Sequence, residues 1–196
     1  MNKKEKTKLI LGSASLFRKK LLEDAGFVFD VKIADIDEKK IRSDDFKDLV
    51  LKIALAKMDA ILEKNNFDSN SIIITFDGVA VHNGELREKP ISKEEVMRWH
   101  KEYVNSKTTM YTSVVAHHIG LNKTLQAVDT TYIDWGEIPE RVIKEMADNS
   151  ITYTAAGFHS RAFLHYAKKV EGSIDTVVGV PLRILENFLE ELGYFE

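Results

Sequence analysis

The chain contains no cysteine, and this absence excludes disulfide bonds and thiolate metal sites. It has only three prolines in 196 residues and no low-complexity linker. No apolar run approaches the roughly 20 residues that a membrane-spanning helix needs. A net charge of -3, from 28 basic and 31 acidic residues, gives no overall attraction to nucleic acid, so a few local cations must hold any anionic ligand.

What is present fits a folded α/β protein. With 44% hydrophobic residues, the chain can build a core without covalent staples, since a domain of this length buries roughly 70% of its unfolded surface. The first eight residues are polar and basic, and the apolar run after them is too short for a secretory signal. We therefore expect a cytoplasmic location.

Segments with strand and helix patterns alternate along the chain, which favours an α/β architecture. The continuous apolar segment 71–75 is typical of a strand covered on both faces. Strands are predicted over 8–12, 27–33, 71–75, 163–170 and 174–178, with hairpins over 79–87 and 110–135. Helices are predicted over 16–24, 44–64, 92–103, 139–147 and 181–192.

Lys57 stands out because it interrupts an apolar helical stripe. It lies four residues from both Ile53 and Ile61, and this spacing places all three on one helix face. A lysine is rarely buried without a partner. Two interpretations stay open at this point. The stem could reach water from the end of the stripe, or the ammonium could point into a polar cleft toward an anion.

Asp77 follows the apolar segment 71–76, where a buried strand is expected to end. Ligands of open α/β sheets bind just outside the carboxyl ends of strands. A carboxylate there could hold a divalent metal or position a water molecule. Aspartate is also common in turns, and Gly78 follows directly, so a turn aspartate is an equally good interpretation.

The segment 12–15, of sequence GSAS, joins the first predicted strand to the first predicted helix. Such a turn presents backbone N–H groups and the positive end of a helix dipole to a phosphate, and Arg18 would add charge. The segment lacks the Walker A pattern, and ordinary serine caps explain it equally well. The carboxylates of 35–38 and the lysine of Lys89-Pro90 carry weaker signals of the same kind.

A series of segments in this order resembles the Maf family of nucleotide pyrophosphatases, and the resemblance covers nearly the whole chain. Residues 9–22 (LILGSASLFRKKLL) are similar to the family's opening LASxSPRRxxLL, 35–38 (DIDE) to its DIDE, and 54–57 (ALAK) to LAxxKA. Residues 74–79 (ITFDGV) are similar to GADTVV, 88–90 (EKP) to GKP, and 111–114 (YTSV) to VYTGV. Residues 171–173 (EGS) and 177–182 (VVGVPL) are similar to EGD and NVVGLPL.

The resemblance implies a mixed, twisted sheet flanked by helices, in one Maf-like domain over 1–196 with two lobes and a cleft between them. It also implies hydrolysis of nucleoside triphosphates to monophosphate and pyrophosphate, a divalent metal such as Mg²⁺ or Mn²⁺, and a homodimer. By this resemblance Asp77 and Glu38 are catalytic carboxylates and metal ligands, and Lys57 and Lys89 are catalytic cations. Ser13, Ser15 and Arg18 are then expected to bind the triphosphate.

Four positions depart from the family pattern, and three of them, where the family has its first arginine, a threonine and a glutamine, set base choice in the family. Leu16 and Phe17 stand where the family has proline and its first arginine, and Gly78 stands where it has threonine. Ser160 or Arg161 replaces a glutamine. We therefore expect altered base specificity, with Phe17 stacking on the base and Arg161 supplying the missing charge as hypotheses.

Three functions remain in view. The first is an active pyrophosphatase that binds nucleoside triphosphates but neither nucleic-acid polymers nor membranes. The second is a catalytically impaired nucleotide-binding relative, which the changed base-reading positions keep open. The third is an interaction scaffold, against which the retained Asp77, Glu38, Lys57 and Lys89 weigh.

Overall fold

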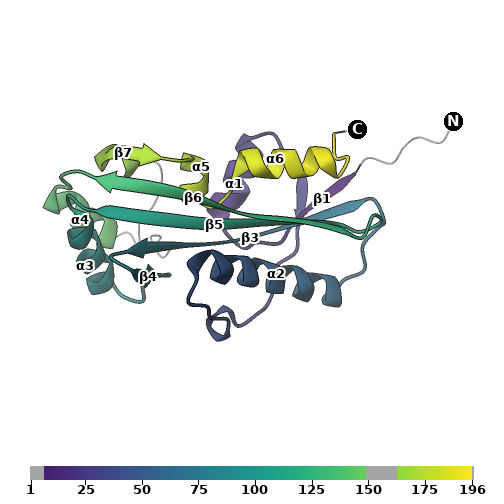
Figure 1. The fold of residues 1–196 in the computed structure, drawn as a ribbon, viewed down its shortest axis with the longest axis horizontal. Coiled ribbons are helices and arrows are strands. Elements are labelled where there is room, and N and C mark those ends of the chain that lie inside the picture. The colour runs from purple at the N-terminus through teal and green to yellow at the C-terminus, as the bar shows by residue number, and fades with distance from the viewer. Residues whose placement is uncertain (1–6, 149–162, 196) are drawn as a thin grey trace. The chain divides into compact units, whose positions relative to one another are not determined.

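The computed structural model describes residues 7–148 and 163–195, which form helices around a mixed sheet (Figure 1). Within these ranges the sheet has seven strands in the order β2-β1-β3-β5-β6-β7, and β4 pairs with β3 beside this path. The predicted α/β class is confirmed. The strands are β1 (Lys8–Leu11), β2 (Phe29–Val31), β3 (Ser71–His82), β4 (Glu85–Arg87), β5 (Lys107–His118), β6 (Lys123–Trp135) and β7 (Ala167–Glu171). The helices are α1 (Leu16–Asp24), α2 (Phe46–Lys64), α3 (Lys93–Tyr103), α4 (Glu140–Asp148), α5 (Ile174–Val178) and α6 (Leu182–Glu191), with 3₁₀ turns η1 (Glu38–Lys40) and η4 (Phe163–Tyr166).

The chain divides into two compact units. Unit 1 comprises Met1–Asp77, Thr112–Asp129 and Gly179–Glu196, and unit 2 comprises Gly78–Tyr111 and Thr130–Val178. Strands β3, β5 and β6 therefore each contribute one part to each unit. The organisation as one domain with a cleft between two lobes stays a prediction, so each unit is described on its own.

Unit 1 is a sheet with helices on both faces. β1 pairs in parallel with β2 and with β3, and the last residue of β1, Leu11, lies opposite Ile74 of β3. Helix α2 covers one face, and α1 and α6 cover the other (Figure 1). The apolar residues between α2 and the sheet are Ile10, Ile73, Val115, Ala54, Met58 and Ile61. Burial of both faces explains why these strands have no polar alternation.

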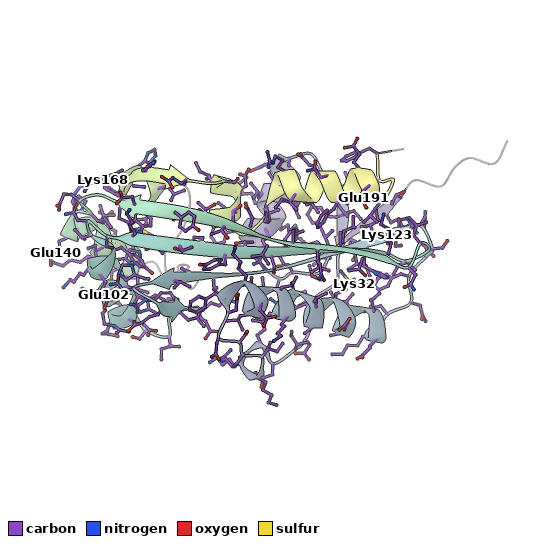
Figure 2. The ribbon with its side chains drawn as sticks, viewed as in Figure 1. Lys32, Glu102, Lys123, Glu140, Lys168 and Glu191 are labelled. Atoms are coloured by element: carbon purple, nitrogen blue, oxygen red, sulfur yellow. The ribbon has the colours of Figure 1, made fainter. Side chains whose placement is uncertain are left out.

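Side-chain caps fix where the helices of unit 1 begin. The Oγ of Ser15 accepts from the Arg18 amide at the start of α1. The carboxylate of Asp45 accepts from two amides of α2, at 2.7 and 3.0 Å, so this helix begins at Phe46 rather than at the predicted residue 44. At the far end of this unit, an ion pair of 2.7 Å joins Lys123 of β6 to Glu191 of α6 (Figure 2).

Unit 2 has its own aromatic core. The hairpin predicted over 79–87 is confirmed, since β3 and β4 are antiparallel. Asn83 and Gly84 at its turn have positive φ angles of 50° and 79°. α3 begins after Ser92, next to the predicted start of this helix, and the Oγ of Ser92 caps it by accepting from the Glu95 amide at 3.2 Å. The core residues are Ala80, Trp99, Tyr103, Met110, Ile133, Trp135, Ile138, Val142, Ile143 and Phe163.

One predicted strand is wrong, and a second is wrong in part. The segment 174–178 is the short helix α5, because Gly172 leaves β7 with a φ of 121° and the Oγ of Ser173 then accepts from the Asp175 amide at 3.2 Å. The predicted strand 163–170 divides into the 3₁₀ turn η4 and β7. In the ranges 7–148 and 163–195, no helix combines the length and apolar character needed to cross a membrane.

Candidate active site

Asp77 lies inside β3 rather than at its end. The strand continues to His82, so the predicted strand end at this aspartate is wrong, and so is its interpretation as a turn residue. Asp77 still lies beyond the carboxyl end of a strand, which is where ligands of open α/β sheets bind, but the strand is β1 rather than β3. β1 ends opposite Ile74, so β3 carries Asp77 three residues past the carboxyl end of its parallel neighbour. The residue is 6% exposed.

Lys57 of α2 meets this carboxylate. Its Nζ donates to Oδ1 of Asp77 at 2.8 Å and to the carbonyl of Phe76 at 3.4 Å, and it lies 3.2 Å from Oε1 of Glu38. Lys57 is 8% exposed, so the interpretation in which its stem reaches bulk water is wrong. The buried ammonium has two carboxylate partners, which is what burial of a lysine requires.

Arg18 approaches the same backbone from α1. One terminal nitrogen donates to the carbonyl of Phe76 at 3.2 Å and to Oγ of Ser13 at 3.4 Å, and Nε donates to the carbonyl of Gly179 at 3.0 Å. The guanidinium also lies over the Phe76 ring, 5.8 Å from its centroid. Because α1 and α2 lie on opposite faces of the unit 1 sheet, the Phe76 carbonyl receives one cation from each face (Figure 1).

Burial sets the electrostatics of this cluster. It raises the pKa of Asp77 above the ordinary range of an aspartate, although the charges of Lys57 and Arg18 oppose the shift. Burial also lowers the pKa of Arg18, against the attraction of Asp77 and Glu38. A carboxylate with a raised pKa is a better proton acceptor for a water molecule than an exposed aspartate.

Two carboxylates, those of Asp77 and Glu38, converge on one ammonium and are the residues that could hold a metal. The side chain of Glu38 is 46% exposed, which leaves it accessible to a ligand. Mg²⁺ is commonly bound by one or two carboxylates together with substrate phosphates. In residues 7–148 and 163–195, no three His, Cys, Asp or Glu side chains form a metal cage. The two carboxylates therefore fit a metal that is shared with phosphate.

The other predicted site residues are only partly brought to this cluster. Ser13 precedes α1, and its Oγ accepts from the amide of Ser15, the α1 cap, at 3.2 Å. Phe17 is partly buried in the first turn of α1, and Gly78 follows Asp77 in β3. Lys89 is an exposed residue of unit 2, and its convergence with unit 1 stays a prediction. Ser160 and Arg161 lie outside the described residues.

Two residues at this site had no predicted role. Gly179 receives the Arg18 guanidinium on its carbonyl, with a φ of 100°. Ser113 is fully buried in β5, and its Oγ accepts from the Asp77 amide at 3.2 Å. Both belong to segments that resemble family motifs, but a strand serine and a loop glycine carry no charge that would have marked them in the sequence.

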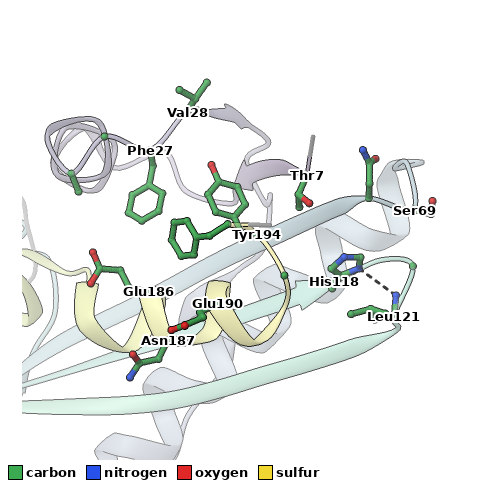
Figure 3. A pocket seen from close by; sticks show the side chains of 16 residues that line it. Thr7, Phe27, Val28, Ser69, His118, Leu121, Glu186, Asn187, Glu190 and Tyr194 are labelled. Carbon is green, nitrogen blue, oxygen red and sulfur yellow. Dashed lines mark hydrogen bonds between the residues drawn. The ribbon is translucent and has the colours of Figure 1, made fainter. Parts of the chain in front are cut away.

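A separate cavity of about 1180 Å³ lies elsewhere in unit 1 (Figure 3). It contains an aromatic group in which the Phe27 ring lies 6.1 Å from that of Tyr194, together with Glu186 and Glu190 of α6. None of the predicted site residues that the structure describes lines it. Asn70, one of its lining residues, precedes Asp77 by seven residues, roughly 23 Å along a strand. This cavity is therefore distinct from the charged cluster.

Comparison with known proteins supports the resemblance that the segments indicated. The chain is 32% identical to a 7-methyl-GTP pyrophosphatase of Dictyostelium discoideum, covering 94% of this chain and 97% of that protein. It is 30% identical to a dTTP/UTP pyrophosphatase of Clostridium beijerinckii, covering 94% and 99%. The solved structure of the Staphylococcus aureus Ham1 protein matches with a TM-score of 0.51 at 12% identity, covering 94% of this chain and 98% of that one. That likeness concerns the fold alone.

The family comparison covers nearly the same residues as the segment resemblance. The model of the family described as Maf-like protein matches residues 8–192. This match includes β1 and α6 and every described residue of the charged cluster. The chain therefore belongs to the Maf family.

Proposed function

We propose that this chain hydrolyses nucleoside triphosphates to nucleoside monophosphate and pyrophosphate. The observation that carries the proposal is the buried contact of 2.8 Å between Lys57 and Asp77, with Glu38 and Arg18 beside it. A triphosphate needs fixed cations for its negative charge and a carboxylate to orient the attacking water. Three relatives are named 7-methyl-GTP pyrophosphatase, nucleoside triphosphate pyrophosphatase and dTTP/UTP pyrophosphatase, and these names agree with this activity.

In the proposed reaction Asp77 accepts a proton from the attacking water as the bond between the α- and β-phosphates breaks. Lys57 and Arg18 stabilise charge on the phosphates, and Lys89 of unit 2 is proposed as a further cation. Asp77 and Glu38 would hold a divalent metal, and Mg²⁺ and Mn²⁺ are the first candidates to test. When bound, such a metal neutralises charge on the leaving pyrophosphate.

We also propose that the base specificity differs from that of relatives with the usual motif. The two residues before Arg18 are apolar, and Leu16 is 77% exposed at the start of α1. An exposed apolar side chain followed by a phenylalanine favours stacking or apolar contact with a base over hydrogen bonding to it. The proposed homodimer rests on family resemblance and is tested by sedimentation. The cytoplasmic location expected from the sequence is tested by cell fractionation.

A nucleotide panel tests both the activity and the specificity. Pyrophosphate release with Mg²⁺ or Mn²⁺ is measured for common, methylated and deaminated triphosphates, with native protein and with Phe17→Ala. We expect metal-dependent release by the native protein and a KM about 10-fold higher for its preferred base in Phe17→Ala, because base–aromatic stacking contributes about 1–3 kcal/mol.

The panel separates the alternatives. Nucleotide binding without pyrophosphate release would support the catalytically impaired alternative. A protein whose melting temperature no nucleotide shifts would support a scaffold. If the Michaelis constants of Phe17→Ala equal those of the native protein for every base, the stacking role is removed.

Gly179→Ala is expected to weaken substrate binding through Arg18. A Cβ at this position would lie 3.1 Å from Nε of Arg18, and the φ of 100° disfavours any side chain. We expect KM to rise about 10-fold because displacing the guanidinium removes a charge-assisted contact of about 1.5–3 kcal/mol. The measurement is steady-state kinetics together with urea unfolding.

Gly26→Ala is the matched control for this variant. Gly26 also has a positive φ, of 86°, but a Cβ there meets no atom within 4 Å. Both variants carry the backbone strain of about 1–2 kcal/mol, and only Gly179→Ala touches Arg18. Equal KM values in the two variants would contradict the role given to the Gly179 carbonyl.

A further inference from the structure

Ser113 joins two elements that carry proposed reacting groups. It is fully buried in β5, and its hydroxyl donates to the carbonyl of Val50 in α2 at 2.8 Å. The same oxygen accepts from the amide of Asp77 in β3 at 3.2 Å. A hydroxyl has one proton and two lone pairs, so both bonds form at once. The result is a chain of two hydrogen bonds from the Asp77 backbone to α2.

This chain reaches the helix face that carries Lys57. Val50 and Lys57 are seven residues apart, which is close to two helical turns, so both lie on the face toward the sheet. Lys57 contacts Oδ1 of Asp77, and Ser113 holds the amide of the same residue. The Ser113 hydroxyl therefore fixes the distance between the helix that supplies the ammonium and the strand that supplies the carboxylate.

Without the hydroxyl, the buried Asp77 amide loses the Ser113 oxygen that accepts its hydrogen bond. A buried N–H without an acceptor is unfavourable, so the backbone is expected to shift toward another acceptor or toward water. Such a shift moves the carboxylate relative to Lys57. Displacements of about 1 Å at a reacting group can lower a rate by about 10²-fold.

Thr75 provides a built-in comparison. Its Oγ1 donates to the carbonyl of Ala54 at 2.8 Å, one helical turn along α2 from Val50, and it is also fully buried. Both hydroxyls therefore bond a strand to α2 in the same way. They differ in one respect, because Ser113 also binds the backbone of Asp77.

We propose that Ser113 is a positioning residue that holds Asp77 against Lys57 for the proposed hydrolysis, and the proposal rests on that function. The quoted family motif has glycine at this position, so the hydroxyl is a property of this chain rather than of the motif. Ser113 acts on the reaction through the Asp77 backbone.

The test compares Ser113→Ala with Thr75→Val. Each variant removes one buried hydroxyl bond to α2, so both are expected to lower the melting temperature, and Ser113→Ala by more because it also leaves the Asp77 amide without its acceptor. Only Ser113→Ala is expected to lower kcat, by about 10-fold with KM changed less than about 2-fold, because the substrate-binding cations are unmoved. Ser113→Gly is a second hydroxyl-free variant should Ser113→Ala fail to fold, with the same expected loss of kcat.

A second readout needs no nucleotide. In the native protein and in Thr75→Val, hydrogen exchange of the Asp77 amide, followed by NMR, is expected to be slow. In Ser113→Ala it is expected to be at least about 10-fold faster, because the amide has lost its acceptor.

The outcomes separate the positioning role from the proposed function. Absence of pyrophosphate release by the native protein contradicts the proposed function, and the positioning role with it. If the native protein turns over, two results overturn the positioning role alone. One is an unchanged kcat or an unchanged Asp77 exchange rate in Ser113→Ala, and the other is an equal loss of kcat in Thr75→Val.

Discussion

Asp77→Asn is expected to lower kcat for triphosphate hydrolysis by about 10³-fold, within the range for removal of a general base. The substitution keeps the shape of the side chain and leaves an oxygen that can accept from Lys57. It removes the group that takes the proton from water and one of the two carboxylates proposed to hold the metal. The measurement is kcat with saturating nucleotide and Mg²⁺.

The same variant is expected to be at least as stable as the native protein at pH 7, because the Lys57 ammonium keeps Glu38 as a carboxylate partner at 3.2 Å. Burial raises the pKa of Asp77 in the folded state, so the folded protein binds this proton more tightly than the unfolded chain. The ionised aspartate therefore destabilises the fold at neutral pH, and this penalty disappears as the pH falls below the ordinary pKa of about 3.9. The stability advantage of Asp77→Asn should shrink over the same range.

Asp35→Asn is the control, since Asp35 lies near Glu38 in sequence but its side chain is 97% exposed. We expect the kcat and the melting temperature of Asp35→Asn to equal those of the native protein. The thermal scans contain a chelator, so that bound metal does not contribute to the melting temperature. Two results would contradict the account. One is native kcat in Asp77→Asn, and the other is a loss of stability in that variant that grows as the pH rises toward 7.

Lys57→Met is expected to reduce both activity and stability. Methionine has a similar length but no charge, so it removes a cation from the phosphates and leaves Asp77 buried without its ion-pair partner. Breaking a buried ion pair from one side lowers the free energy of unfolding by about 3–5 kcal/mol. Loss of one fixed donor at a site of developing charge lowers kcat by about 10²–10³-fold.

A double variant separates these two effects. In Lys57→Met/Asp77→Asn neither charge is left unpaired, so we expect the free energy of unfolding to recover by about 2 kcal/mol or more relative to Lys57→Met. Activity should not recover, because both groups take part in the proposed reaction. Urea unfolding and steady-state kinetics give the two quantities.

The exposed ion pair of Lys64 and Asp35, whose charged atoms are 4.0 Å apart, is the control for this cycle. Lys64 lies on α2, as Lys57 does, and Asp35 lies three residues before Glu38. Lys64→Met should change the free energy of unfolding by less than about 0.5 kcal/mol, as surface substitutions usually do. Additive effects of Lys57→Met and Asp77→Asn would contradict the buried contact, since groups in contact are expected to couple.

The sequence predicted those site residues whose charge conflicts with the apolar pattern around them. Lys57 is a charged residue on an apolar stripe, and an anionic partner was one of its two interpretations. Asp77 follows an apolar strand, and a role in a site was one of its two interpretations. Their contact of 2.8 Å shows that each is the partner of the other. Family resemblance added Glu38, whose carboxylate contacts Lys57. Glu38 lies in an acidic, exposed segment, and this position alone would not have singled it out.

The parts that were not predicted depend on contacts between distant segments. The apolar composition of 174–178 suits a strand, but the Gly172 turn and the Ser173 cap make it a helix. The strand 71–75 and the first arm of the hairpin 79–87 were predicted as separate segments, and the structure joins them through Asp77 into the single strand β3. The role of Ser113 depends on a bond across 36 positions of the chain. Propensity and periodicity describe neighbours in sequence, and these three features are set by neighbours in space.

Product analysis by ³¹P NMR tests the central claim most directly. Native protein, incubated with Mg²⁺ and the triphosphate it prefers in the panel, is predicted to yield nucleoside monophosphate and pyrophosphate in equal amounts, with no orthophosphate. Nucleoside diphosphate with orthophosphate, or the same products at the same rate from Asp77→Asn, would contradict it.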